Sequence, residues 1–430
     1  MASRLPPGST FPRGFANAES MAWELIPARE LFELKYGKAL VETSRRPGRV
    51  PVYGTNGRCG SHDEGLFSGP GVILGRKGQG PLGVEWCDGD YWVIDTAYSL
   101  APLRPDVDLK YAYYLIKFIG LNHLKDGTSN PTLSRDSFGA QALPLPPLAV
   151  QRATAQILGT LDDKIELNRR MNQTLEAMAQ ALFKSWFVDF DPVRAKSEGR
   201  DTGLPAHIAD LFPDSFEDSA LGEIPKEWAV VALRDLTSRL NRGISPAYVA
   251  SGGICVLNQK CIRDGRIDFA KARRHDPNGK LVGGRTLQAL DILVNSTGVG
   301  TLGRVAQVRE LPQTAVADSH VTVVRAGEGV DPWWLGLGLV GREAQIEALG
   351  EGSTGQTELS RTRLGELLCV VPPARLQQVL GRLAATLLSR VVANDRESST
   401  LAALRDGLLP KLMSGSVCSS RGAKLVEANA

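Results

Sequence analysis

The residues from Pro146 to Phe190 read PPLAVQRATAQILGTLDDKIELNRRMNQTLEAMAQALFKSWFVDF, and they decide how the chain is organised. On a heptad repeat the a positions fall on Leu161, Asn168, Leu175 and Leu182, and the d positions fall on Ile157, Met171 and Met178. This pattern, carried on strong helix formers, predicts a long helix with a coiled-coil seam. The proline pair predicts an abrupt helix start, and Asn168, the one polar residue at an a position, is expected to fix the register of a helix pair.

A second helix in the same chain carries the same pattern. After a shift of 226 residues, Pro372-Pro373 coincides with Pro146-Pro147, Gln377 with Gln151, Asn394 with Asn168, and Leu408 with Leu182. The two helices are therefore predicted to pair with each other, antiparallel, as a coiled coil. The alternative is two unrelated amphipathic helices, each covering its own domain.

Composition bounds the rest of the chain. Its 430 residues are too many for one typical core, so two or three domains are expected. The net charge of +3 neither requires nor excludes nucleic acid as a partner. No apolar run reaches about 18 residues, so no membrane span is expected. The six cysteines show no CxxC pair, which favours reduced thiols in a cytoplasm over a metal site.

The repetition extends beyond the helices. Trp23–Leu31 resembles Trp228–Leu236, Gly75–Gly83 resembles Asn295–Gly303, Val93–Tyr98 resembles Val316–Val321, and Gly127–Arg135 resembles Ser353–Arg361. The chain thus reads as globule, helix, globule, helix. We predict a flexible arm over 1–18, globules over 19–145 and 226–371, helices over 146–190 and 372–415, a linker over 191–225, and a flexible tail over 416–430.

Each globule is predicted to be β-rich with some helix, which makes the chain an α+β protein. Short strands are expected at Val50–Tyr53, Gly71–Leu74 and Tyr91–Ile94, where apolar residues are bounded by Gly and Pro. Helices are expected at Leu109–Ile119 and Trp333–Leu349.

Two glycine motifs fit the pattern GxGxxG, at Gly78–Gly83 and Gly298–Gly303. A dinucleotide site needs a helix after the glycines, but the residues that follow both motifs alternate like strands. A Gly-rich hairpin is therefore favoured, although a nucleotide-dependent enzyme stays open as an alternative. We find no other catalytic motif, and Asp162-Asp-Lys164 is interpreted as a solvated helical face.

Basic residues gather at equivalent places in the two globules. The first group includes Lys38, Arg58, Arg76 and Lys77, and the second includes Lys260 and Arg263. Arginine and lysine neutralise phosphates or contact guanine, while Asn and Gln contact adenine. Nucleic acid is one explanation of these clusters, and an ordinary solvated surface is the other.

The segment from Pro146 to Arg194 resembles the central conserved region of specificity subunits of type I restriction–modification systems. The first globule resembles their target-recognition domains at Tyr36-Gly-Lys38, Pro51–Gly57, Gly75–Gly78 and Asp95-Thr96. The second globule departs from the first, with Asn295-Ser-Thr-Gly298 in place of Gly75-Arg-Lys-Gly78. The C-terminal helix also departs, with Arg390 and Glu397 at d positions where the first helix has Lys164 and Met171.

The resemblance implies two target-recognition domains, related by a pseudo-twofold internal repeat, that bind double-stranded DNA. It implies a non-catalytic, cytoplasmic subunit that binds no cofactor and works with two methylation and two restriction subunits, on which S-adenosylmethionine, ATP and Mg act. The candidate DNA contacts are Lys38, Tyr53, Asn56, Arg58, Arg76, Lys77, Ser129, Asn130, Arg135, Lys260, Arg263, Asn295, Ser296, Thr297, Thr354, Gln356 and Arg361. The candidate subunit-interface residues are Asn168, Trp186, Phe187 and Asn394, of which Trp186 and Phe187 are expected to be exposed.

A helix of about 40 residues spans about 60 Å, so the pair is expected to hold the two domains at a set distance. The expected result is recognition of a bipartite, asymmetric DNA sequence with an unread spacer of about one turn, about 34 Å. A bivalent protein scaffold without a DNA role remains a further alternative.

Overall fold

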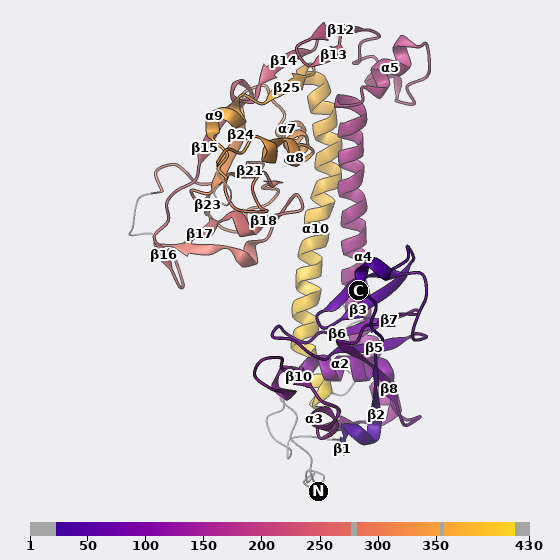
Figure 1. The fold of residues 1–430 in the computed structure, drawn as a ribbon. Helices are drawn as coiled ribbons and strands as arrows, with labels where there is room; N and C mark the ends of the chain where they lie inside the picture. The colour runs from indigo at the N-terminus through magenta and orange to yellow at the C-terminus, as the bar shows by residue number, and fades with distance from the viewer. Residues whose placement is uncertain (1–22, 277–281, 353–356, 418–430) are drawn as a thin grey trace. The chain divides into compact units, whose positions relative to one another are not determined.

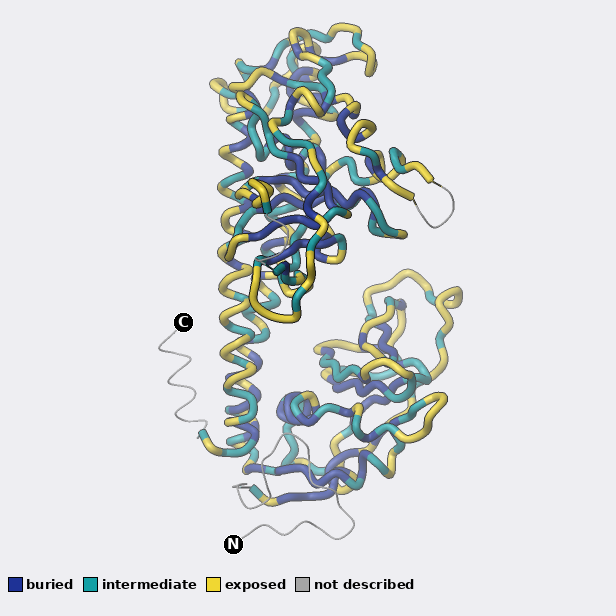
Figure 2. The backbone as a smooth tube through the Cα atoms, turned by 90° about the vertical axis from the view of Figure 1, so that its left-hand side faces the viewer, coloured by how far each residue is buried: buried dark blue, intermediate teal, exposed yellow. Residues whose placement is uncertain are grey.

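The computed structural model describes residues 23–276, 282–352 and 357–417. The chain divides into two compact units. Unit 1 contains the described residues up to Leu167 and those from Glu397 onward, and unit 2 runs from Asn168 to Arg396. Each unit has a buried interior of its own, drawn in dark blue in Figure 2, as expected for a chain too long for one core. The predicted arm and most of the predicted tail lie outside the described residues.

Unit 1 is built on two small sheets. The first has the order β2-β8-β5-β6 and is antiparallel throughout, with strands β2 (Phe32–Tyr36), β8 (Ala97–Pro102), β5 (Gly71–Gly75) and β6 (Val84–Cys87). The second has the order β4-β3-β7, in which β3 (Val50–Gly54) is antiparallel to β4 (Gly57–His62) and parallel to β7 (Trp92–Val93). A separate pair joins β1 (Glu24–Pro27) to β11 (Ala142–Leu145). These elements confirm the three predicted strands.

Helix α2 (Leu109–Ile119) packs on β5 and β6 and forms at the predicted residues. Its start is capped by Asp108, whose carboxylate accepts from the Tyr111 N–H at 2.8 Å. It ends at Gly120, whose φ of 72° is readily adopted only without a side chain. The shorter helices of this unit are α1 (Ala28–Leu31) and α3 (Arg135–Gly139).

Unit 2 repeats this arrangement. Its first sheet has the order β15-β24-β21-β22, with strands Thr237–Arg242, Val321–Ala326, Ile292–Asn295 and Val305–Gln307. Its second has the order β16-β20-β17-β23, with strands Tyr248–Val249, Arg273–His275, Ile254–Leu257 and Ala315–Ala317, and β17 is again parallel to β23. The pair β14 (Ala229–Ala232) and β25 (Leu368–Val371) corresponds to β1 and β11. The predicted internal repeat and the α+β class are confirmed.

One detail of the predicted repeat is wrong by one residue. The sequence motif aligns Asp95 with Asp318. In the structure the residue equivalent to Asp318 is Ile94, because the backbone N–H groups of these two residues make equivalent hydrogen bonds. Ile94 donates to the Tyr53 carbonyl at 2.9 Å, and Asp318 donates to the Leu257 carbonyl at 2.9 Å. The register of the parallel strands, which the local motif does not reveal, sets the correspondence.

Two buried glutamines make the repeat visible at the level of single hydrogen bonds. Gln151 accepts from the Asp108 N–H at 2.8 Å and donates to the Pro146 carbonyl at 2.8 Å. Gln377 accepts from the Asp331 N–H at 3.1 Å and donates to the Pro372 carbonyl at 2.9 Å. Each glutamine therefore joins the start of a long helix to the start of a shorter one.

The long helices are α4 (Leu148–Phe187) and α10 (Ala374–Met413), of 40 residues each, and they lie side by side in Figure 1. In unit 1, Arg405 pairs with Asp162 at 2.7 Å and Glu397 pairs with Lys164 at 3.5 Å. Residue numbers rise along one helix as they fall along the other, so the pair is antiparallel, as predicted. Asp162 also accepts from the Tyr114 hydroxyl at 2.9 Å, so its interpretation as a solvated face is wrong.

The buried stripe of α4 departs from the predicted heptads in its second half. Leu161 and Asn168 are buried as predicted, but Met178 is 48% exposed and Ala179 and Phe183 are buried. The buried positions 161, 168, 172, 179 and 183 repeat every 11 residues, close to the 3.6-residue turn of a straight helix. The heptad assignment of Met178 is wrong because a straight helix drifts away from a 3.5-residue repeat.

Two further segments differ from expectation. The helix predicted over Trp333–Leu349 is two helices, α7 (Pro332–Val340) and α8 (Glu343–Ala348), separated at Gly341. Residues 191–225, predicted to be a linker, contain α5 (Asp191–Ser197), α6 (Ala206–Ala209) and the hairpin of β12 (Phe216–Ser219) and β13 (Gly222–Pro225).

Matched substitutions test the internal repeat. Gln151→Leu and Gln377→Leu should each destabilise the protein by about 1–3 kcal/mol, because each leaves a buried N–H and a buried carbonyl without a partner. The exposed Gln156 on α4 is the control, and Gln156→Leu should change stability by less than about 0.5 kcal/mol. Urea denaturation measures all three. A large cost for only one of the two buried glutamines would contradict their equivalence.

Candidate nucleic-acid interface

Three loops of unit 1 that are far apart in sequence meet beside the β5–β6 hairpin. The Thr55 hydroxyl donates to the Lys77 carbonyl at 2.7 Å, which ties the β3–β4 turn to the glycine-rich loop. The Gly78 N–H donates to the Pro131 carbonyl at 3.0 Å and Lys125 Nζ donates to the Gly80 carbonyl at 3.0 Å, which ties the same loop to residues 125–133. The predicted candidates near positions 56, 77 and 130 therefore lie in one region.

The glycines of this loop serve backbone packing. A Cβ on Gly75 would lie 2.1 Å from the Thr55 carbonyl oxygen, so the two loops approach closely only because Gly75 lacks a side chain. The strand β5 before the glycines pairs antiparallel with β6 after them. The Gly-rich hairpin is confirmed, and the helix that a dinucleotide site requires after the glycines is replaced by a strand.

Most candidate contacts of unit 1 are accessible. Lys38, Asn56, Arg58, Ser129, Asn130 and Arg135 are exposed. Lys77 is half-buried and pairs with Asp95 at 3.1 Å. Tyr53 is a correction, since it is buried and packs edge-on against Tyr91, with ring centroids 6.4 Å apart. Burial raises the pKa of the Tyr53 hydroxyl, and the ring belongs to the interior rather than to a DNA contact.

Tyr36 is a surface residue that we did not include among the candidate contacts. Its ring is 48% exposed. The guanidinium of Arg135 lies 4.2 Å from the ring centroid and that of Arg76 lies 4.8 Å from it. Arg76 also donates to the Asp95 carbonyl at 3.1 Å. One aromatic ring thus holds two guanidinium groups at the surface, where each can fork onto a phosphate or a guanine.

The sequence contained only half of this signal. Tyr36 stands in the motif Tyr36-Gly-Lys38, which marked the region, but its position at the end of a strand gives no sign of Arg76 or Arg135. Those residues are 40 and 99 positions away. Only the register of β2 against β8 and the closure of the loop before α3 bring the three together.

In unit 2 two candidate contacts are wrong. Asn295 and Ser296 are fully buried at the end of β21. The Asn295 amide donates to the Gln259 carbonyl at 3.0 Å, and the hydroxyls of Ser296 and Thr322 lie 2.6 Å apart. These side chains point into the unit, so they hold loops together and do not reach a ligand. Thr297 is half-buried, with its hydroxyl 2.8 Å from His320 Nδ1.

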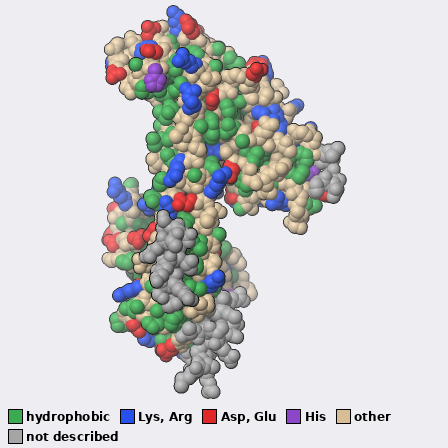
Figure 3. All heavy atoms as spheres, turned by 180° about the vertical axis from the view of Figure 1, so that it is seen from behind, with side chains coloured by type: hydrophobic (Ala, Val, Ile, Leu, Met, Phe, Trp, Pro, Cys, Tyr) green, Lys and Arg blue, Asp and Glu red, His purple; other side chains and the backbone are tan. Residues whose placement is uncertain are grey.

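The remaining candidates of unit 2 lie on its surface. Lys260, Arg263 and Arg361 are exposed. Arg263 pairs with Asp264 at 3.4 Å, while Arg361 donates to the Asn241 side-chain oxygen at 2.6 Å. Thr354 and Gln356 lie outside the described residues. On the face drawn in Figure 3, basic and acidic side chains are interspersed.

Trp186 and Phe187 are not exposed, and the predicted apolar docking surface built on them is wrong. Both are buried in the interior of unit 2. Trp186 packs edge-on against Phe212, with ring centroids 5.4 Å apart, and Phe187 packs against Trp228 at 5.8 Å. Because residues 191–225 have a polar composition, the sequence showed no sign that Phe212 of this segment packs over Trp186 and shields it from solvent.

Asn168 and Asn394 are also buried, where α4 and α10 pack together in unit 2. Asn168 Nδ2 donates to the Asn394 carbonyl at 3.4 Å, and Asn394 Nδ2 donates to Asn172 Oδ1 at 2.8 Å. A direct contact of these side chains with another subunit is therefore wrong. Their role in fixing the helix register stays a prediction.

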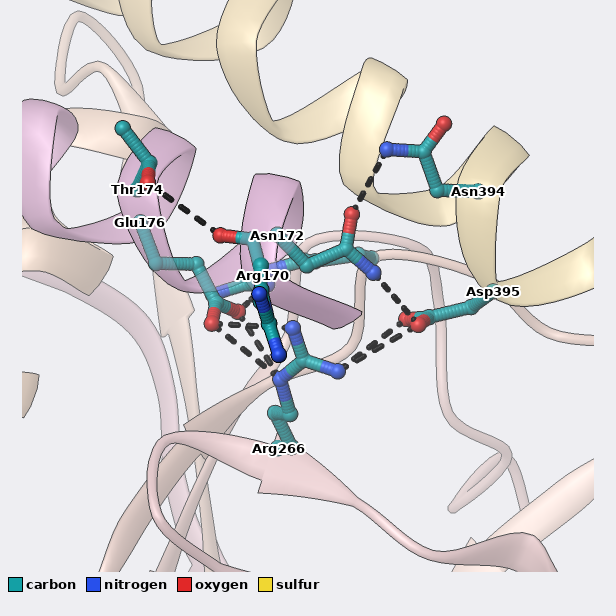
Figure 4. A network of polar contacts seen from close by, with 8 residues as sticks. Arg170, Asn172, Thr174, Glu176, Arg266, Asn394 and Asp395 are labelled. Atoms are coloured by element: carbon teal, nitrogen blue, oxygen red, sulfur yellow. Dashed lines mark hydrogen bonds and ion pairs between the residues drawn. The ribbon is translucent and has the colours of Figure 1, made fainter. Parts of the chain in front are cut away.

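An ion-pair cluster joins both helices to the strands of unit 2 (Figure 4). Arg266, on β19 (Arg266–Ile267), pairs with Glu176 of α4 at 2.9 Å and with Asp395 of α10 at 3.3 Å. Arg309 pairs with the other Glu176 oxygen at 2.5 Å. The Glu176 carboxylate therefore serves two guanidinium groups, of which Arg309 is mostly buried and Arg266 is 35% exposed.

Within the part of the chain that the structure describes, no group of three or more His, Cys, Asp or Glu side chains is placed to hold a metal ion. None of the described helices combines the length and apolar character needed to cross a membrane.

Comparison with known proteins gives the class to which this arrangement corresponds. Residues 21–177 match the family described as Type I restriction modification DNA specificity domain. This match agrees with the family that the sequence resemblance predicts.

The similarity extends over most of the chain. It is 24% identical over 390 residues to the type I restriction enzyme HindI specificity subunit of Haemophilus influenzae, covering 77% of this chain and 82% of that protein. It is 24% identical over 327 residues to the MjaIX specificity subunit of Methanocaldococcus jannaschii, covering 71% and 68%. Its fold is similar to the type I restriction-modification S subunit from M. genitalium, with a TM-score of 0.59 and 18% identity over 94% of this chain and 99% of that one.

The Glu176 cluster gives a prediction about stability. Glu176→Gln should cost about 3 kcal/mol, because the mostly buried Arg309 then keeps its charge without a carboxylate partner, while Arg266 is partly solvated and retains Asp395. The control is Glu310→Gln, which removes the partner of the exposed Arg396 and should cost at most about 1 kcal/mol. Thermal and urea unfolding measure both variants. Equal losses would show that burial of the cluster does not matter.

Proposed function

We propose that this chain is the DNA sequence-recognition subunit of a type I restriction–modification complex. The observation that carries the proposal is that the chain contains one architecture twice, with different side chains on the two equivalent surfaces. Both units have a four-stranded sheet in the same strand order, and both have a second sheet that contains one parallel strand pair. The second sheet has three strands in unit 1 and four in unit 2. The match to the specificity domain covers the described residues of unit 1 up to Leu167. At equivalent strand ends, unit 1 presents Tyr36 and unit 2 presents Arg242, while the place of Arg76 is taken by the buried Ser296.

Each unit is proposed to read one half of a bipartite DNA site. The exposed Asn56, Arg58 and Asn130 in unit 1, and Lys260 and Arg361 in unit 2, supply the donors and acceptors that base edges and phosphates require. Since the two surfaces differ, the two half-sites differ and the whole site is asymmetric. The helices α4 and α10 are proposed to set the unread spacer, of about one turn or about 34 Å.

The chain is proposed to act without catalysis of its own, in the cytoplasm. It would bring two methylation subunits and two restriction subunits to the DNA, and S-adenosylmethionine, ATP and Mg would be used by those subunits. This part of the proposal rests on the names of the related specificity subunits. The docking surface for the partners no longer includes Trp186 and Phe187, because both are buried.

A stand-alone nucleotide-dependent enzyme is disfavoured by the β5–β6 hairpin, in which the glycines close a loop between strands. A scaffold without a DNA role would leave the match of residues 21–177 to a DNA specificity domain unexplained.

Footprinting tests the proposal directly. The full chain, assembled with the methylation subunits and given DNA that carries the sequence at which adenines are methylated in the source cells, should protect two short segments. An unprotected stretch of about one turn should separate them. Protection of one continuous segment, or equal protection of scrambled DNA, would reject the proposed mode of recognition.

The arginine pair on Tyr36 gives a second test. Tyr36→Leu should weaken binding to the recognition duplex by about 1–2 kcal/mol, since two cation–π contacts of about 0.5–1 kcal/mol each are lost. Tyr36→Phe is the matched control and should retain most of the affinity, because the ring remains. Fluorescence anisotropy with the assembled complex measures both. If phenylalanine and leucine weaken binding equally, the ring does not position the two arginines.

A further inference from the structure

Unit 2 contains an arginine-lined groove in which Arg361 is the only residue that belongs to the contacts proposed above. It encloses about 620 Å³ beside the edge strand β15. Five guanidinium-bearing residues line it, together with Asn241, a serine and two glycines: Arg239, Arg242, Arg285, Arg325 and Arg361. No aromatic side chain contributes to this lining.

The groove carries more positive charge than its own carboxylates offset. Arg325 forms a bidentate pair with the buried Asp291, at 2.6 and 2.7 Å, and Arg242 pairs with Glu358 at 2.6 Å. The other three arginines have no carboxylate partner among the described residues. Arg239 and Arg285 donate to backbone carbonyls, and Arg361 donates to the Asn241 side chain.

Strand pairing places two of these arginines against each other. Arg239 on β15 lies directly opposite Arg325 on β24, and like charges in this position destabilise a sheet. Burial lowers the pKa of Arg239, the neighbouring Arg325 and Arg285 lower it further, and Asp291 offsets part of this effect. The fold therefore carries an electrostatic cost here that an anion bound in the groove would relieve.

The equivalent place in unit 1 is different. Gly37 and Gly243 are equivalent positions and so align the two copies. A Cβ on Gly37 would lie 2.2 Å from the Ile94 carbonyl oxygen, and a Cβ on Gly243 would lie 2.0 Å from the Ala317 carbonyl oxygen. With that alignment, the opposed pair Arg239 and Arg325 corresponds to Glu33 and Ala101, which are paired on β2 and β8. The charge excess is thus a property of the second copy and not a requirement of the shared fold.

We propose that this groove binds phosphate groups of the DNA backbone, independently of sequence, beside the half-site read by unit 2. This inference rests on the proposed function. Guanidinium groups fork onto phosphate oxygens, and the groove lacks the aromatic surface on which a base would stack. Its rim also includes Arg242 and Arg361, which occupy the positions in unit 2 that Tyr36 and Arg135 occupy in unit 1. A duplex that unit 2 binds at these two arginines therefore also reaches the groove.

The test uses Arg239→Gln with Arg285→Gln in the full chain assembled with its methylation subunits. Arg325 is left intact because it compensates the buried Asp291. The matched control, Lys226→Gln with Arg234→Gln, removes the same charge from exposed positions outside the groove. Arg239→Lys with Arg285→Lys keeps the charge, and an unchanged melting temperature shows that each variant is folded.

Anisotropy titrations over a range of salt concentrations supply the readout. The glutamine pair should lower the slope of log K against log salt by about 2, one unit for each lost phosphate contact. Affinity should fall roughly tenfold at low salt, by the same factor for the recognition duplex and for scrambled DNA. The control pair and the lysine pair should keep the slope of the unmodified complex.

Three outcomes would overturn the inference. One is an unchanged salt slope, and another is a loss confined to the recognition sequence. The third is protection from thermal unfolding by inorganic pyrophosphate that the glutamine pair abolishes while duplex binding stays unchanged, which would make the groove a site for a free anion. If the unmodified complex prefers no duplex sequence, the proposed function fails. The salt slope measured on scrambled DNA still shows whether the groove binds backbone phosphates.

Discussion

Two helices that each carry a long apolar stripe cannot remain apart in water, and the pairing of α4 with α10 is the constraint on which both units depend. Leu158 of α4 is buried with Leu412 and Met413 of α10 in the interior of unit 1. Phe183 of α4 is buried with Leu388 of α10 in the interior of unit 2. Neither sheet system therefore has a complete core without a segment of both helices. Inside the seam the Asn394 side chain donates to Asn172 Oδ1, so polar groups that are buried there find partners on the facing helix.

The repeat separates what the fold requires from what recognition requires. Gln151 and Gln377 each join the start of a long helix to the start of a shorter one. Gly37 and Gly243 allow the same close approach of two backbone segments. Tyr36 and Arg242 occupy equivalent strand ends but present different chemistry. Equal interiors with unequal surfaces are what a single chain needs to read two unlike half-sites with one architecture.

The sequence predicted the architecture well because periodicity and repetition carry it. The helix pair, the hairpin at Gly75–Gly83 and the helix at Leu109–Ile119 all follow from local patterns. It predicted the candidate surface less well, since a residue type does not state which way its side chain points. Asn295 faces inward at a strand end, while Tyr36 faces outward and meets arginines that only strand register brings near.

The division of the chain into units has a consequence for synthesis. Unit 2 is one continuous stretch, whereas unit 1 combines an early stretch with residues from Glu397 onward. During synthesis every residue of unit 2 therefore leaves the ribosome before unit 1 can complete its fold, because Leu412 and Met413 belong to the interior of unit 1. The amino-terminal part of unit 1 stays incompletely folded until the end of α10 has been synthesised. A chain truncated near residue 397 would therefore lose a folded unit 1 and keep unit 2.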